Sequence, residues 1–202
     1  TQLPNLDNIT MIVEAYPEGI HKPNRRGEYP LHCAVQAKRP FSEIVDLLIE
    51  LGGKRICDVQ DKYGHTPLHN AVTRKGVEAL MVVETLVEQA PQTCKHQDVR
   101  GMLPLHWAVS RLEPKLEYLI ELIDSYPFAV IQKDEFGKMP IDRILAYGND
   151  RCASSMNFLN ETYEKMLGVR KETIRFWEED FLGKAPHVSK LKAPNQAPRP
   201  TP

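Results

Sequence analysis

The amino-acid sequence predicts an all-α solenoid, in which pairs of helices stack side by side and a turn projects from each pair. Two observations support this prediction. A short motif recurs four times along the 202 residues, and an apolar segment with helical spacing follows each copy. The glycines of the four copies are 37, 37 and 36 residues apart: Gly27, Gly64, Gly101 and Gly137. A constant period of about 20–50 residues is the sequence signature of stacked repeats.

Each copy of the motif has the residue types of a turn followed by the start of a helix. The first copy places Asn24 before Gly27, and Gly27 before Pro30. Asn or Asp opens a turn because its side chain bonds to the backbone that follows, and glycine tolerates a positive φ. Proline fits at the first position of a helix, where the N–H has no helical partner. The four repeats therefore start near residues 24, 61, 98 and 134.

Two helices are expected in each repeat. The first is short and begins at the motif proline, which places first helices near residues 31–35, 68–72, 105–109 and 140–146. The second is longer and has an apolar face, which places second helices near residues 42–51, 78–89, 114–125 and 151–167. Residues 5–16 have the character of a second helix, so residues 1–23 are interpreted as a half repeat. A break such as Tyr126-Pro127 follows the second helix.

The motif resembles the ankyrin repeat, whose signature D-x-x-G-x-T-P-L-H-x-A opens each turn–helix–turn–helix unit. The resemblance covers about residues 5–167 and places residues 1–168 in one ankyrin-repeat domain with β-turn fingers. The chain departs from the signature, because its threonine is present only at Thr66 and the repeats are longer than the usual length of about 33 residues. The resemblance implies a module that binds another protein, with no catalytic residues and no cofactor.

The charge distribution gives no global signal for nucleic acid or for a membrane surface, because the net charge is −1. No segment approaches the roughly 18–20 apolar residues of a membrane-spanning helix. Four widely spaced cysteines favour a reducing compartment, so we expect an intracellular protein, cytoplasmic by default. Because the chain starts at Thr1, we interpret it as processed or truncated, which leaves an organelle open.

Histidine and cysteine columns of the repeat could be mistaken for chemical sites. Stacking separates His32, His69 and His106 by roughly 10 Å, too far for one zinc ion with bonds of about 2.0–2.1 Å. The resemblance implies that these histidines brace the turn and the helix through hydrogen bonds. Cys57 and Cys94 align with apolar residues of the neighbouring units, which predicts core positions. We therefore expect no metal site.

The resemblance assigns partner binding to a concave groove formed by the fingers and the first helices. The expected groove residues are Arg26, Tyr63, His65, Asn70, Arg100, Met102, Trp107, Phe136 and Arg143. Trp107 is larger than the stack requires, so we expect it to be at least partly exposed. Two interpretations remain open, a binding hot spot and a cover over neighbouring loops. For the hot spot, Trp107→Ala should abolish binding and leave the melting temperature nearly unchanged.

The C-terminal region changes character after the repeats. Residues 169–182 form an amphipathic pattern with Ile174, Trp177 and Phe181 on one face, which predicts a capping helix or a docking helix for a partner. Residues 183–202 contain five prolines, four basic residues and no acid. This composition predicts an extended basic tail, either a free linker or an arm on a neighbouring subunit.

These features together predict a non-catalytic adaptor, or one domain of a larger scaffold, that binds a protein partner through its groove. The alternative is an accessory structural subunit of a large assembly, including an organellar one, anchored by its terminal arms. Neither interpretation identifies the partner, because fold does not imply function.

Overall fold

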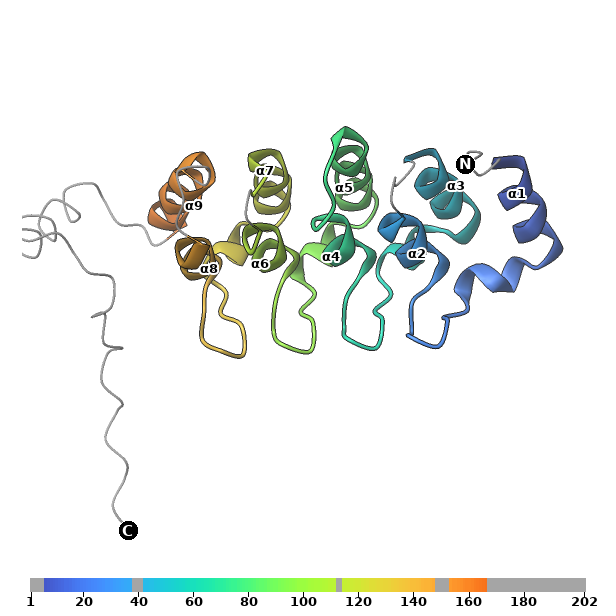
Figure 1. The fold of residues 1–202 in the computed structure, drawn as a ribbon, viewed down its shortest axis with the longest axis horizontal. Coiled ribbons are helices and arrows are strands. Elements are labelled where there is room, and N and C mark those ends of the chain that lie inside the picture. Colours follow the sequence, from blue (N-terminus) through green and yellow to red (C-terminus); the bar gives the residue numbers. More distant parts are fainter. Residues whose placement is uncertain (1–5, 38–41, 112–113, 148–152, 167–202) are drawn as a thin grey trace, which may run out of the picture. The chain divides into compact units, whose positions relative to one another are not determined.

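The computed structural model describes residues 6–37, 42–111, 114–147 and 153–166. Within these ranges the elements are helices and turns, and they stack in one direction along the chain (Figure 1). The predicted all-α solenoid is therefore confirmed. The segments 169–182 and 183–202, with Ile174, Trp177 and Phe181, lie outside the described residues.

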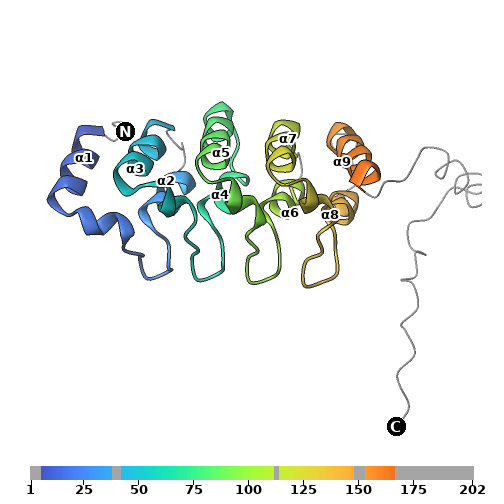
Figure 2. The same cartoon turned by 180° about the vertical axis from the view of Figure 1, so that it is seen from behind.

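The helices form two parallel rows, and both views of the ribbon show the same arrangement (Figure 1, Figure 2). The inner row contains the first helix of each repeat: α2 (Pro30–Gln36), α4 (Pro67–Ala71), α6 (Pro104–Val109) and α8 (Pro140–Tyr147). The outer row contains the second helices: α1 (Leu6–Ala15), α3 (Ser42–Gly52), α5 (Val77–Gln89), α7 (Leu116–Ser125) and α9 (Ala153–Met166). Each inner helix packs against the outer helix that follows it.

Short 3₁₀ helices follow the first four outer helices where the sequence predicts only a break. They are η1 (Pro17–His21), η2 (Lys54–Cys57), η3 (Pro91–Lys95) and η4 (Pro127–Ile131). In η1, η3 and η4, proline at the first position ends the α-helix before it and fixes φ for the tighter turn. In η2 the break is Gly53, which has a positive φ of +72°. The bond from Gly19 N–H to the Tyr16 carbonyl, 3.0 Å, has the three-residue spacing of a 3₁₀ helix. Each η helix then leads the chain towards the next turn.

The projecting turns, here called fingers, are residues 24–29, 61–66, 98–103 and 134–139. In the second finger, Oδ1 of Asp61 accepts the backbone N–H groups of Tyr63 at 2.8 Å and His65 at 2.9 Å. The equivalent Asn or Asp makes the same two bonds in the other fingers. Four similar side chains therefore give four similar turns.

One backbone hydrogen bond joins each finger to the next. Lys62 N–H donates to the Arg26 carbonyl at 3.4 Å, Val99 N–H to the Tyr63 carbonyl at 3.0 Å, and Glu135 N–H to the Arg100 carbonyl at 3.0 Å. This close approach explains the second role of glycine in the motif. A Cβ on Gly64 would lie 2.9 Å from Cα of Asp98, whereas a Cβ on Gly137 in the last finger would meet no atom within 4 Å.

The motif histidines connect consecutive repeats. Nδ1 of His69 accepts the Thr66 N–H at 3.1 Å, so Nε2 carries the proton and donates to the Met102 carbonyl of the next finger at 3.1 Å. His32 and His106 repeat both contacts. Burial lowers the pKa of all three, that of His69 to about 4. The expected bracing role is confirmed.

The fourth repeat carries an aspartate where the others carry histidine. Oδ2 of Asp142 accepts the Met139 N–H at 2.9 Å, which reproduces the contact made by histidine Nδ1. An ionised carboxylate has no proton to donate to a following repeat. Asp142 therefore keeps the contact within the fourth finger but does not supply the forward donor of the histidines.

The core runs continuously between the two rows of helices. Cys57 and Cys94 are buried, as predicted, and burial raises the pKa of the Cys57 thiol to about 11. Among the described residues the core ends at α1, which contains no buried residue. Ile12 is 68% exposed there, although Ile49 at the equivalent position of α3 is only 7% exposed.

Candidate protein-binding surface

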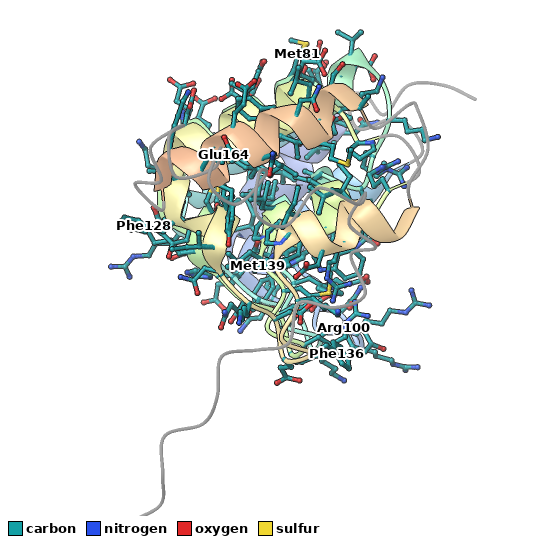
Figure 3. The ribbon with its side chains drawn as sticks, turned by 90° about the vertical axis from the view of Figure 1, so that its left-hand side faces the viewer. Met81, Arg100, Phe128, Phe136, Met139 and Glu164 are labelled. Carbon is teal, nitrogen blue, oxygen red and sulfur yellow. The ribbon has the colours of Figure 1, made fainter. Side chains whose placement is uncertain are left out.

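The sequence-predicted groove residues divide into an exposed set and a set that braces the fingers. Arg26, Tyr63, Arg100 and Phe136 occupy the same position in successive fingers, immediately before the motif glycine. We call them the tip row. All four are exposed, and Figure 3 shows Arg100 and Phe136 at the finger edge, opposite Met81 and Glu164 on the outer helices.

An aromatic and basic cluster adjoins the middle of the tip row. The rings of Tyr63 and His65 are 5.9 Å apart, and the His65 ring meets the Trp107 ring edge-on at 5.1 Å. The Arg100 guanidinium lies 4.9 Å from the centre of the Trp107 ring, which is a cation–π geometry. Four of the residues that the sequence assigned to the groove therefore lie together.

Trp107 is half-buried, which confirms the expected partial exposure. Its indole N–H donates to Oδ2 of Asp98 at 3.0 Å. Burial of Asp98 opposes its ionisation, but the bonds from Met102 N–H, the indole and Arg100 N–H outweigh this effect and hold the pKa below its usual value. The indole thus holds the third finger while part of its ring faces solvent.

Arg143 has the same bracing role in the fourth repeat. Its guanidinium bonds to Oδ2 of Asp134, with Nε at 2.8 Å, and its side chain is mostly buried. Its charge is thereby paired within the turn. In both repeats the donor lies nine residues after the turn aspartate, a shared spacing that sequence reasoning could have used.

Met102 and Asn70, two further predicted groove residues, are partly or fully buried. Met102 was expected in the exposed patch, but it is only 3% exposed, so this prediction was wrong. Burial of the apolar methionine side chain lowers the free energy of the folded state. Lys138, at the same position in the fourth finger, is charged and remains exposed. Asn70 is half-buried, and its Nδ2 makes no hydrogen bond within the described residues.

The finger edge and the outer helices differ in charge. The turn aspartates are buried, which leaves mainly basic side chains exposed on the fingers: Arg25, Arg26, Lys62, Arg100 and Lys138. Glu28 and Glu135 are the acidic side chains that still reach solvent there. Each of the five outer helices contains two or three acidic residues, with Lys165 as the one basic residue among them. The positive edge thus lies opposite a negative back.

The part of the chain that the structure describes offers little basis for a metal site or a membrane span. No three His, Cys, Asp or Glu side chains there are placed to hold a metal ion. No helix in the described ranges has the length and apolarity to cross a membrane. A pocket between the starts of α5 and α7 has Lys115, Glu117 and Tyr118 as its ionisable lining residues.

Comparison with known proteins agrees with the repeat architecture. A family model described as ankyrin repeats (3 copies) matches residues 4–92 and again residues 43–126. No curated protein sequence matches the chain. The two matches together span more than half of the sequence, and the fingers and bridging histidines supply the corresponding geometry. The chain therefore belongs to the ankyrin-repeat family.

Proposed function

We propose that this chain is a non-catalytic adaptor that binds a partner protein through its finger edge. Ankyrin repeats are generally protein-interaction modules, and the family is typically non-catalytic. The observation that supports a role for this edge is the tip row. Tyr63 is 57% exposed and Phe136 is 67% exposed, so the fold does not need either aromatic ring for its core. Exposed aromatic and arginine side chains are the residue types that dominate binding hot spots.

The histidines and cysteines that could have served in catalysis have structural roles. His32, His69 and His106 connect repeats through both ring nitrogens, and Cys57 and Cys94 are core residues. The thiols of Cys57 and Cys94 have raised pKa values because they are buried, which disfavours the reactive thiolate. A non-catalytic role in a reducing, intracellular compartment accords with these features.

Site-specific photo-crosslinking tests this proposal. A photoreactive phenylalanine analogue replaces Tyr63 at the finger edge, and in a matched protein it replaces Tyr16. Tyr16 is also a tyrosine and is 56% exposed, but it lies at the end of α1. In cells that express the protein, we expect a discrete cross-linked protein species from position 63 and none of the same mass from position 16.

Competition establishes that the cross-link is specific. Excess unlabelled wild-type protein should suppress the species, whereas excess Phe136→Ala should suppress it poorly. Phe128→Ala is the matched competitor, because Phe128 is 55% exposed on η4 and should compete as well as wild type. Cross-links that are identical at positions 63 and 16 would contradict binding at the finger edge.

A further inference from the structure

The tip row alternates between two kinds of side chain. Its order along the stack is arginine, tyrosine, arginine and phenylalanine, at positions 26, 63, 100 and 136. In the described part of the chain, the side chains of Arg26, Tyr63 and Phe136 make no hydrogen bond, although their backbone N–H groups do. The Arg100 side chain is 47% exposed, with its guanidinium over the Trp107 ring and its Nε 3.8 Å from Oδ2 of Asp98. The row therefore offers cationic and aromatic groups in regular alternation.

The spacing of the row is fixed by the stack. Neighbouring fingers share a backbone hydrogen bond, and neighbouring inner helices pack directly against each other. Packed helix axes lie about 8–10 Å apart. Equivalent residues of successive fingers consequently recur every 8–10 Å or so, and the two arginines lie about twice that distance apart.

A polyproline II segment has a matching repeat. It has three residues per turn and rises about 3.1 Å per residue, so every third side chain lies on one face at intervals of about 9 Å. A β-strand fits poorly, because residues on one face recur every two residues, or about 6.6 Å. An α-helix returns to the same face after about seven residues, near 10.5 Å, so spacing alone does not exclude it.

The aromatic environment favours polyproline II over the helix. Tyr63, His65 and Trp107 are in ring contact beside the row. Proline-rich segments dock on surfaces lined by aromatic side chains, and they are already ordered before binding. The charges favour an acidic segment, because carboxylates complement Arg26 and Arg100 while the acidic outer helices would repel a misdirected anion.

We propose that the tip row binds an acidic, proline-rich segment of a partner protein in the polyproline II conformation. Carboxylates at positions i and i+6 of that segment meet Arg26 and Arg100, and apolar side chains at i+3 and i+9 meet Tyr63 and Phe136. This inference rests on the proposed function and specifies the partner's chemistry. A single-stranded nucleic acid is a weaker match, because its continuous negative charge would also face Glu28 and Glu135 on the fingers.

Fluorescence anisotropy with designed peptides tests the inference. The first peptide has Glu at i and i+6, Leu at i+3 and i+9, and proline at the other positions. The second has the same composition with Glu and Leu at every second position. The third places them at every seventh position of an alanine-based helix, and the fourth probe is an oligo-dT strand. We expect saturable binding of the first peptide, at least about fivefold tighter than each other probe.

Charge reversal tests the contacts themselves. Arg26→Glu should weaken the first peptide about fivefold or more, and a peptide with Lys at position i and Glu kept at position i+6 should regain that loss on the variant. Arg55→Glu is the matched control, because Arg55 is an exposed arginine on η2 outside the fingers, and it should bind like wild type. Circular dichroism melts establish that each variant is folded.

The inference fails if the first peptide does not saturate, or if the second peptide, the helical peptide or oligo-dT binds as tightly. It also fails if Arg26→Glu and Arg55→Glu have equal effects. A specific cross-link at position 63 together with no peptide binding would refute this partner chemistry and leave the proposed function standing. Loss of the specific cross-link would refute the proposed function itself.

Discussion

Trp107 and Asp98 are joined across nine residues of sequence, with the indole N–H 3.0 Å from a carboxylate oxygen that is buried inside the third finger. Removal of the indole leaves that carboxylate without one of its donors and opens space beside His65. We expect Trp107→Ala to lower the free energy of unfolding by about 2 kcal/mol or more, unlike the hot-spot expectation from the sequence. Urea denaturation at neutral pH measures this loss.

Trp107→Phe separates the two contributions, because phenylalanine keeps much of the ring contact and loses the N–H. The free energy of unfolding of Trp107→Phe should fall by about 1 kcal/mol, less than that of the alanine variant. Tyr63→Ala is the control for an exposed ring and should stay within about 0.5 kcal/mol of wild type. An unchanged stability of Trp107→Ala would show that the Asp98 contact contributes little.

Glycine substitutions should report contact between fingers. Gly64 and Gly137 have nearly equal positive φ values, +77° and +71°, so alanine carries a similar backbone strain of about 1 kcal/mol at both sites. Only Gly64→Ala also forces a Cβ against the backbone of the next finger. We expect it to be about 2 kcal/mol more destabilising than Gly137→Ala, as measured by thermal and urea unfolding. Equal losses of unfolding free energy in the two variants would mean that neighbouring fingers can move apart with little loss of stability.

The end of the stack predicts a contrast between two isoleucines at equivalent positions. Ile49→Ala should cost about 2–5 kcal/mol, because the side chain is only 7% exposed and belongs to the core. Ile12→Ala should change the free energy of unfolding by less than about 0.5 kcal/mol, because Ile12 is mainly exposed on α1. A large loss from Ile12→Ala would show that other residues cover this face of α1.

The bridging histidines predict acid sensitivity at mild pH. Burial lowers the pKa of His69 to about 4 in the folded chain, whereas a histidine in the unfolded chain has a pKa of about 6.5. Between these two pH values the unfolded chain therefore binds more protons than the folded chain. Stability should therefore fall as the pH drops from about 6.5 towards 4, by about 3 kcal/mol for His69. Chemical denaturation at a series of pH values measures the slope, which should decrease in His69→Gln. A flat stability between pH 7 and pH 5 would contradict this role.

The fold could be predicted from the sequence because the same turn-and-helix motif recurs four times. The turn residue, the glycine and the proline recur in one order, and each has a local effect that does not depend on distant contacts. The 3₁₀ helices were not predicted, because a proline or glycine break is compatible with either a loop or a tight helical turn. Their form depends on how the chain crosses to the next finger.

The candidate surface was predictable only in part. The positions of the tip row follow from the repeat, so Tyr63, Arg100 and Phe136 are exposed as expected. Met102 and Arg143 are less exposed than predicted, because their side chains turn towards the protein. Met102 is buried, and Arg143 bonds to Asp134. Whether a long side chain turns inward depends on atoms of the neighbouring turn, which a repeat alignment does not contain.

Asp142 has a consequence for how such a protein could lengthen. Residues 61–97 carry a histidine that donates forwards and a finger carbonyl that receives the next amide, so one copy of this module is interchangeable with a further copy placed directly after it. New modules can accordingly be duplicated within the array. A module placed after the fourth finger would receive no such donor from an ionised Asp142, and Asp142→His would supply it.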